Sequence, residues 1–129
     1  MIHRFLLGKE ERLNKKLIIQ KLFNEGKVIK AFPLRFLVLS NTKQVEKPVQ
    51  ILISVPKKNF KNAVQRNLLK RRIKEAYRQN KNELHEILST NNIQIALGIV
   101  YISDKISEYN VIEKKISRAL AEIGAFLSE

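Results

Sequence analysis

The chain has 129 residues, a hydrophobic fraction of 44% and a formal net charge of +13 at pH 7. This length suits a single domain with one compact core, and the hydrophobic fraction favours a folded chain over a disordered one. The absence of cysteine excludes disulfides and thiolate metal sites, while the excess charge points to nucleic acid first, anionic membrane second and acidic proteins third. The apolar part of residues 1–8 is too short for a signal peptide, and no apolar run approaches the ~20 residues of a membrane span. We therefore expect a soluble, cytoplasmic protein.

The first part of the chain predicts a tail and a helix. Residues 1–12 interleave basic and apolar side chains and are predicted to form a flexible basic arm. A helix is predicted to follow, from a cap at Asn14 to a stop at Gly26. Its apolar residues recur at helical spacing: Leu17, Ile18, Leu22 and Phe23.

Three further segments have the periodicity of strands and a fourth that of a helix. Residues 28–41 and 49–55 alternate as strands do, and the first is broken near Pro33. Residues 93–102 are apolar at nearly every position, which is typical of a central strand covered on both faces. From Asn110 to Leu127 the apolar residues recur every three or four positions, which predicts a final helix. With the helix described next, the pattern predicts one α/β (α+β) sandwich over residues 1–129, a mixed sheet of about four strands with three helices.

The stretch 57–81 is the most unusual part of the sequence. It holds ten of the 25 basic residues and a single acid, Glu75. Asn62 is a suitable cap for a helix reaching about Leu88. On that helix the apolar residues gather on one side, and five polar residues gather nearly opposite: Asn67, Lys70, Arg71, Lys74 and Arg78. Like charges one turn apart cost roughly 0.2–0.5 kcal/mol per pair, so a face of one sign favours a phosphate-binding surface over a merely solvated one.

The residues that catalysis would need are scarce. His3 and His85 lack the spacing of metal ligands, the four glycines are scattered, and Asp104 is the only aspartate. A carboxylate cage for two magnesium ions is therefore hard to assemble. We expect no catalytic side chain, and any nucleic-acid chemistry must use a reactive centre supplied by another component.

The sequence AVQRNLLKRRIKEAYR at 63–78, which follows SVPKK at 54–58, resembles the signature of the bacterial ribonuclease P protein subunit. The likeness extends to Arg12-Leu13, to Leu22-Phe23 before Gly26, and to the order of elements. It implies a non-catalytic subunit that binds a large catalytic RNA and the 5′ leader of precursor tRNA. Cleavage would then use Mg²⁺ held by the RNA, with no cofactor intrinsic to the protein. It also implies the fold of the second domain of ribosomal protein S5, with a left-handed β-α-β crossover.

The resemblance assigns two sets of site residues. The RNA-binding set is Lys57, Lys58, Lys61, Asn62, Arg66, Asn67, Lys70, Arg71, Lys74 and Arg78. The leader cleft, between the first helix and the sheet, would use Arg12, Ile19 and Phe23, and Phe36 on the strand could add a stacking surface. An ordinary position in the core is the alternative for both phenylalanines, and it is the favoured one for Phe36. Three positions depart from the family pattern: Leu68 and Lys74 stand where arginine is usual, and Lys61 replaces a glycine in a turn with one extra residue.

Two alternatives remain at this point. Another structured-RNA-binding protein, for example a ribosome-associated one, would explain the charge but not the Arg-Asn-x-x-Lys-Arg helix. A peripheral membrane protein would need a basic helix with a free apolar side, whereas here the core claims that side.

Overall fold

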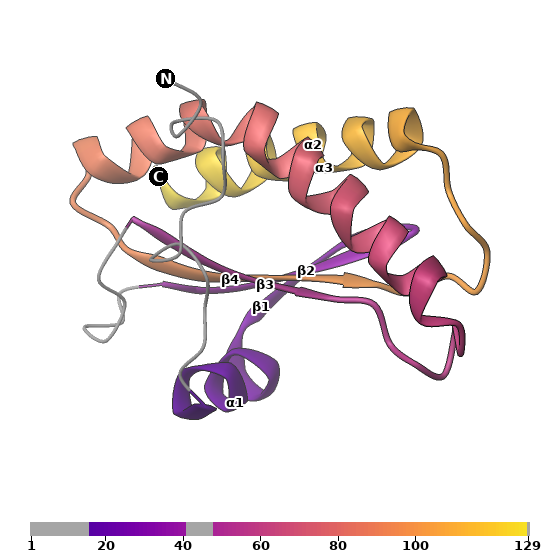
Figure 1. Ribbon diagram of the computed structural model, residues 1–129. Helices are drawn as coiled ribbons and strands as arrows, with labels where there is room; N and C mark the ends of the chain where they lie inside the picture. Colours follow the sequence, from indigo (N-terminus) through magenta and orange to yellow (C-terminus); the bar gives the residue numbers. More distant parts are fainter. Residues whose placement is uncertain (1–15, 41–47, 129) are drawn as a thin grey trace, which may run out of the picture.

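The computed structural model describes residues 16–40 and 48–128. Four strands form one open sheet, with two helices on one face and one helix on the other (Figure 1). The elements are α1 (Lys16–Glu25), β1 (Lys27–Ala31), β2 (Leu34–Ser40), β3 (Val49–Ser54), α2 (Ala63–Thr90), β4 (Ile95–Tyr101) and α3 (Tyr109–Leu127). The predicted element order is confirmed, while the arm at 1–12, the cap at Asn14 and Arg12 lie outside the described residues.

The sheet is mixed, as predicted. Its strand order is β1-β2-β4-β3, in which β2 is antiparallel to both β1 and β4, and β3 is parallel to β4. β4 is an inner strand and is almost wholly buried, which confirms the expectation for 93–102. β1 and β2 are separated at Phe32-Pro33, a cis peptide bond, because proline offers no N–H to a ladder.

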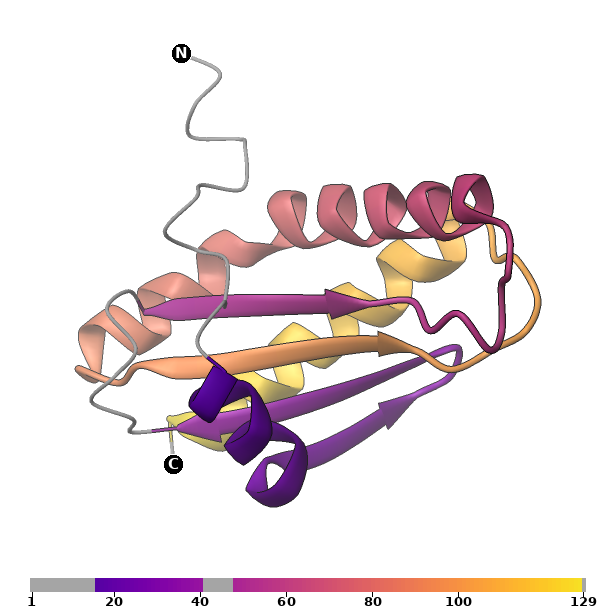
Figure 2. The same cartoon turned by 60° about the horizontal axis from the view of Figure 1, so that its bottom comes forward.

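The connection from β3 through α2 to β4 has the rarer hand. Figure 2 shows the sheet from the α1 side, with β3 above β4, both strands pointing right, and α2 behind the sheet. This path is a left-handed β-α-β crossover. It confirms the expectation drawn from the family resemblance, against the right-handed rule for such connections.

Alternation along the strands divides the apolar residues between two cores. The larger core lies between the sheet and the pair α2 and α3, and it contains Phe36 from β2. The smaller core holds α1 against the opposite face, where Ile18 and Leu22 meet Leu37. Gly98 permits this approach, since a Cβ atom there would lie 3.2 Å from Leu22 Cδ2. The sheet is thus covered fully on one side and partly on the other.

Candidate nucleic-acid interface

The basic residues of α2 face away from the larger core. Leu69, Ile73 and Tyr77 are each 0% exposed on the inner side of this helix. Because an α-helix turns by 100° per residue, Asn67, Lys70, Arg71 and Lys74 lie on the opposite, outer side. We call the outward residues and the adjoining loop the cationic face: Lys57, Lys58, Lys61, Asn67, Lys70, Arg71 and Lys74. The predicted phase of this helix is therefore confirmed.

The lysines and arginine of the cationic face have no compensating partner among the described residues. Across residues 16–40 and 48–128, none of their side chains forms a salt bridge or a hydrogen bond. All are exposed except Lys70, which is half-buried. Asn62 begins the helix as predicted: its Oδ1 accepts a hydrogen bond of 2.7 Å from the Val64 amide. Six cations are thus available to a polyanion along one helix and the loop that precedes it.

Arg66 occupies a different environment from the cationic face. Its Nη1 donates to the main-chain oxygens of Phe60, at 2.7 Å, and of Lys61, at 2.9 Å. Phe60 is buried and its ring lies 5.8 Å from the ring of Tyr101. The turn that departs from the family pattern is therefore held by the Arg66 hydrogen bonds and by the buried Phe60 ring. Lys57, Lys58 and Lys61, in this turn and just before it, are exposed to solvent.

Arg78, at the far end of the predicted set, is paired with the acid of the stretch. Its guanidinium donates to both carboxylate oxygens of Glu75, which also accepts a bond of 2.8 Å from Gln79. The hydrogen bond from Arg78 holds the pKa of the Glu75 carboxyl below its usual value, so the carboxylate stays ionised at neutral pH. The charge of Arg78 is therefore compensated within the helix, and Arg78 is not part of the cationic face.

Arg72 points to a different flank of α2 from the cationic face. Its Nη1 donates to the main-chain oxygen of Ser107, at 2.6 Å. The same loop is held by the Tyr101 hydroxyl, which accepts from the Ser107 amide at 2.9 Å. Arg72 therefore fixes the loop between β4 and α3 and does not extend the cationic face.

The residues assigned to the leader cleft separate onto two sides of the sheet. Ile19 packs against the smaller core and Phe23 is 48% exposed, both on α1. Phe36 is 0% exposed and belongs to the larger core. Its assignment to the cleft is wrong, because the ring faces α2 and α3 and offers no surface for a base to stack on. Arg12 lies outside the described residues.

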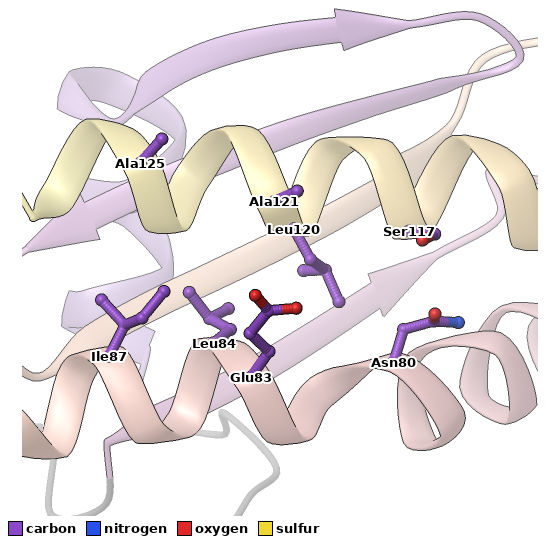
Figure 3. Close-up of a pocket in the computed structure, with 8 residues that line it drawn as sticks. All are labelled: Asn80, Glu83, Leu84, Ile87, Ser117, Leu120, Ala121 and Ala125. Atoms are coloured by element: carbon purple, nitrogen blue, oxygen red, sulfur yellow. The ribbon is translucent and has the colours of Figure 1, made fainter.

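Two features elsewhere bear on other kinds of site. A cavity of about 280 Å³ lies between α2 and α3, and Figure 3 shows Glu83, Leu84 and Ile87 on one wall opposite Ser117, Leu120, Ala121 and Ala125 on the other. None of the predicted site residues lines it. Among the described residues, no three His, Asp or Glu side chains are grouped to hold a metal ion, and no helix is long and apolar enough to cross a membrane.

Sequence reasoning missed one group of exposed residues. Lys30 and Arg35 lie directly opposite each other on β1 and β2, and Phe32 between these strands is 65% exposed. The sequences of both strands contained a signal, because Lys30 and Arg35 are each a charged residue flanked by apolar ones. Only the pairing of the two strands puts the two charges together.

The chain matches known proteins over nearly its whole length. The family model described as Ribonuclease P matches residues 7–123. The Ribonuclease P protein component of Porphyromonas gingivalis is 34% identical over 119 residues, covering 92% of this chain and 87% of that protein. The Ribonuclease P protein component of Chlorobium phaeobacteroides is 33% identical over 132 residues, covering 95% and 90%.

Solved structures show the same fold. The RNase P protein of Staphylococcus aureus superposes with a TM-score of 0.68 at 21% identity, covering 88% of this chain and 94% of that one. The RNase P protein from Thermotoga maritima gives a TM-score of 0.66 at 21% identity, covering 87% and 96%. Taken with the sequence matches, these likenesses show that the chain belongs to the ribonuclease P protein family.

Proposed function

We propose that the chain, as the protein component of a ribonuclease P, binds the catalytic RNA through its cationic face and the 5′ leader of precursor tRNA on the α1 side of the sheet. The family membership supports the subunit role. The single observation that carries the assignment of surfaces is the cationic face itself, a row of cations that no carboxylate of the described residues neutralises. Binding would release counterions from the RNA phosphates, so affinity would fall steeply with salt.

The second surface is proposed from α1. The Phe23 side chain is 48% exposed, whereas the neighbouring Leu22 is fully buried in the smaller core. An unpaired base stacked on an aromatic ring contributes about 1–3 kcal/mol, largely independent of its identity. Phe23, with Ile19 beside it, would thus hold single-stranded leader with little base readout. The reactive Mg²⁺ would be bound by the RNA, and the protein would raise substrate affinity and help to position the RNA groups that hold the ions.

The test is reconstitution with a bacterial ribonuclease P RNA and a precursor tRNA at low Mg²⁺. The protein is expected to promote release of the leader, and Lys70→Ala with Arg71→Ala is expected to weaken its binding to the RNA subunit. Lys114→Ala with Arg118→Ala is the matched control, because these exposed cations lie on α3. With about six phosphates contacted, log affinity against log salt should have a slope of several units.

Three results would contradict the proposal. A nearly flat salt response would exclude binding through phosphates. Equal effects of the α2 and α3 double variants would show that total charge, and not the cationic face, determines affinity. A protein that binds RNA but leaves leader cleavage unchanged would instead fit another structured-RNA-binding role.

A further inference from the structure

Two like charges face each other across the hairpin of β1 and β2. Lys30 and Arg35 are partners in the antiparallel register, and both are exposed. Side chains directly opposite in such a pair lie about 5 Å apart, and like charges there are destabilising. Neither cation forms a salt bridge with a carboxylate in the part of the chain that the structure describes. Folding therefore gains nothing from this pair, and an anion from outside would relieve it.

An exposed aromatic ring adjoins the pair. Phe32 lies in the turn between the two strands and is 65% exposed, although every other described phenylalanine except Phe23 is at least half-buried. A ring left in water contributes little to the core, whereas a nucleic-acid base can stack on it. Cations beside an exposed aromatic are the combination with which proteins hold single-stranded nucleic acid.

The hairpin lies at the same end of the sheet as the cationic face. Arg35 pairs with Val100 of β4, and Val100 pairs with Ser54, the last residue of β3. Lys57 and Lys58 follow three and four residues later. Neighbouring strands are about 4.8 Å apart, so Lys30 to Ser54 spans three spacings, about 14 Å. Figures 1 and 2 both place the β1–β2 turn and the beginning of α2 at the same end of the molecule.

The cations also face the side of the sheet that carries α1. Leu37, two residues after Arg35, packs against Leu22 of α1, and residues two apart on a strand share a face. Figure 2 shows that α1 covers the opposite end of the sheet, away from the β1–β2 turn. A strand of RNA crossing from the loop at 57–58 toward α1 would meet this uncovered end.

We propose that Lys30, Phe32 and Arg35 form a second contact for single-stranded RNA, which holds the substrate leader beyond the segment at Phe23. This inference rests on the proposed function, because it takes the leader to be the strand on this face. The cations would neutralise phosphates and the Phe32 ring would stack on a base. An anionic membrane or an acidic protein would need a broader apolar or basic surface than one turn provides.

The experiment compares precursors with a full-length leader and with a leader trimmed to a stub, each bound by the reconstituted holoenzyme. Phe32→Ala should weaken binding of the full-length leader by at least about fivefold, and Phe32→Tyr, which keeps a ring, should restore it. Lys30→Gln with Arg35→Gln should lower the salt slope for the full-length leader by about 1–2. Lys114→Gln with Arg118→Gln is the charge-matched control. Binding of the stub precursor and of the catalytic RNA should stay at the wild-type level.

The outcomes separate this contact from the proposed function. If the wild-type holoenzyme prefers the full-length leader and the variants keep that preference, the hairpin contact is refuted while the proposed function stands. Equal losses for both precursors, or weaker assembly with the catalytic RNA, would place the hairpin against the RNA subunit and overturn the leader assignment. If the wild-type protein does not promote cleavage, the proposed function fails and the leader contact fails with it.

Discussion

The guanidinium of Arg66 donates a hydrogen bond of 2.7 Å to the main-chain oxygen of Phe60. A second bond from the same nitrogen reaches Lys61, and the Phe60 ring is buried against Tyr101. The arginine that the family pattern assigns to RNA thus also shapes the loop of the cationic face. Arg66 therefore contributes both a positive charge and the geometry of the loop, and a substitution that keeps the charge can separate the two contributions.

Arg66→Lys keeps the charge and should still destabilise the protein. The lysine ammonium ends one bond nearer the backbone than the Nη1 atom that donates to both carbonyls, so it does not reach them in the same geometry. A partly buried carbonyl without a partner costs about 1–3 kcal/mol. Chemical unfolding should show this loss, and RNA affinity should fall because Lys57, Lys58 and Lys61 are no longer fixed. Arg71→Lys is the control, since Arg71 is exposed, and its stability change should stay within about 0.5 kcal/mol. Equal stabilities for Arg66→Lys and Arg71→Lys would show that the hydrogen bonds from Arg66 to the loop do not stabilise the fold.

Glu75→Gln should strengthen binding to the catalytic RNA. The change removes the carboxylate that neutralises Arg78, so the salt slope should rise by about 1. The stability cost should be less than about 1 kcal/mol, because Glu75 is 40% exposed and such ion pairs contribute little. A Glu86→Gln control removes an exposed acid near the other end of α2. If both variants gain affinity equally, the gain comes from net charge alone.

The Glu75–Arg78 pair also predicts a dependence of stability on pH. The pKa of Glu75 is lowered in the folded protein, chiefly by the hydrogen bond from Arg78. Its contribution is therefore present above the ordinary carboxyl pKa and is lost as pH falls through the lowered value. Wild type should lose more stability than Glu75→Gln when unfolding is followed from neutral pH into acid. A constant difference between the two proteins at all pH values would contradict this linkage.

Tyr109→Phe should stabilise the fold by about 1 kcal/mol. The hydroxyl oxygen of Tyr109 is buried and has no hydrogen-bond partner among the described residues, so removing it removes a desolvation cost. Tyr101→Phe should do the opposite, because the Tyr101 hydroxyl bonds the loop at Lys105 and Ser107. Thermal unfolding of the two variants tests this, and a loss of stability in both would show that the Tyr109 hydroxyl is satisfied.

The same tyrosine should affect stability in alkali. The pKa of Tyr109 is raised above its usual value, mainly by burial and to a lesser extent by the negative charges of Glu75 and Glu113. Above pH ~10 the unfolded chain loses this proton more readily than the folded one, so wild-type stability falls. The advantage of Tyr109→Phe should therefore grow as pH rises past that point, and an advantage that shrinks there would be inconsistent with a raised pKa.

Gly98→Ala should displace α1 without disturbing α2. The added methyl would lie 3.2 Å from Leu22 Cδ2 and 3.5 Å from Leu37 Cβ, and overpacking of this kind costs about 1–3 kcal/mol. Affinity for a precursor with a full leader should fall, whereas affinity for the catalytic RNA should not. Gly124→Ala is the control, because its methyl would meet Ile87 on the other side of the sheet. Loss of leader affinity in both variants would mean that general destabilisation, and not the place of α1, is responsible.

Local periodicity determined a large part of this protein. The helical phase of residues 63–88 places Leu69 and Ile73 inside and Arg71 outside whatever the helix packs on, because each residue advances the helix by 100°. The Asn62 cap and the break at Pro33 are equally local, since each depends on neighbouring backbone groups only. Hence the element order and the helical part of the cationic face could be predicted from the amino-acid sequence.

Only the tertiary structure decided which face of the sheet α1 covers, which distant residues pair, and which hand the crossover from β3 to β4 has. Alternation shows that Phe36 and Leu37 point to opposite sides of β2, but both sides are apolar, so nothing local says which one α1 covers. The Arg72–Ser107 contact joins residues 35 apart, and the pairing of Lys30 with Arg35 appears only when two strands are in register. Periodicity is a property of a few consecutive residues, whereas these contacts and the left-handed crossover depend on how distant segments share one sheet.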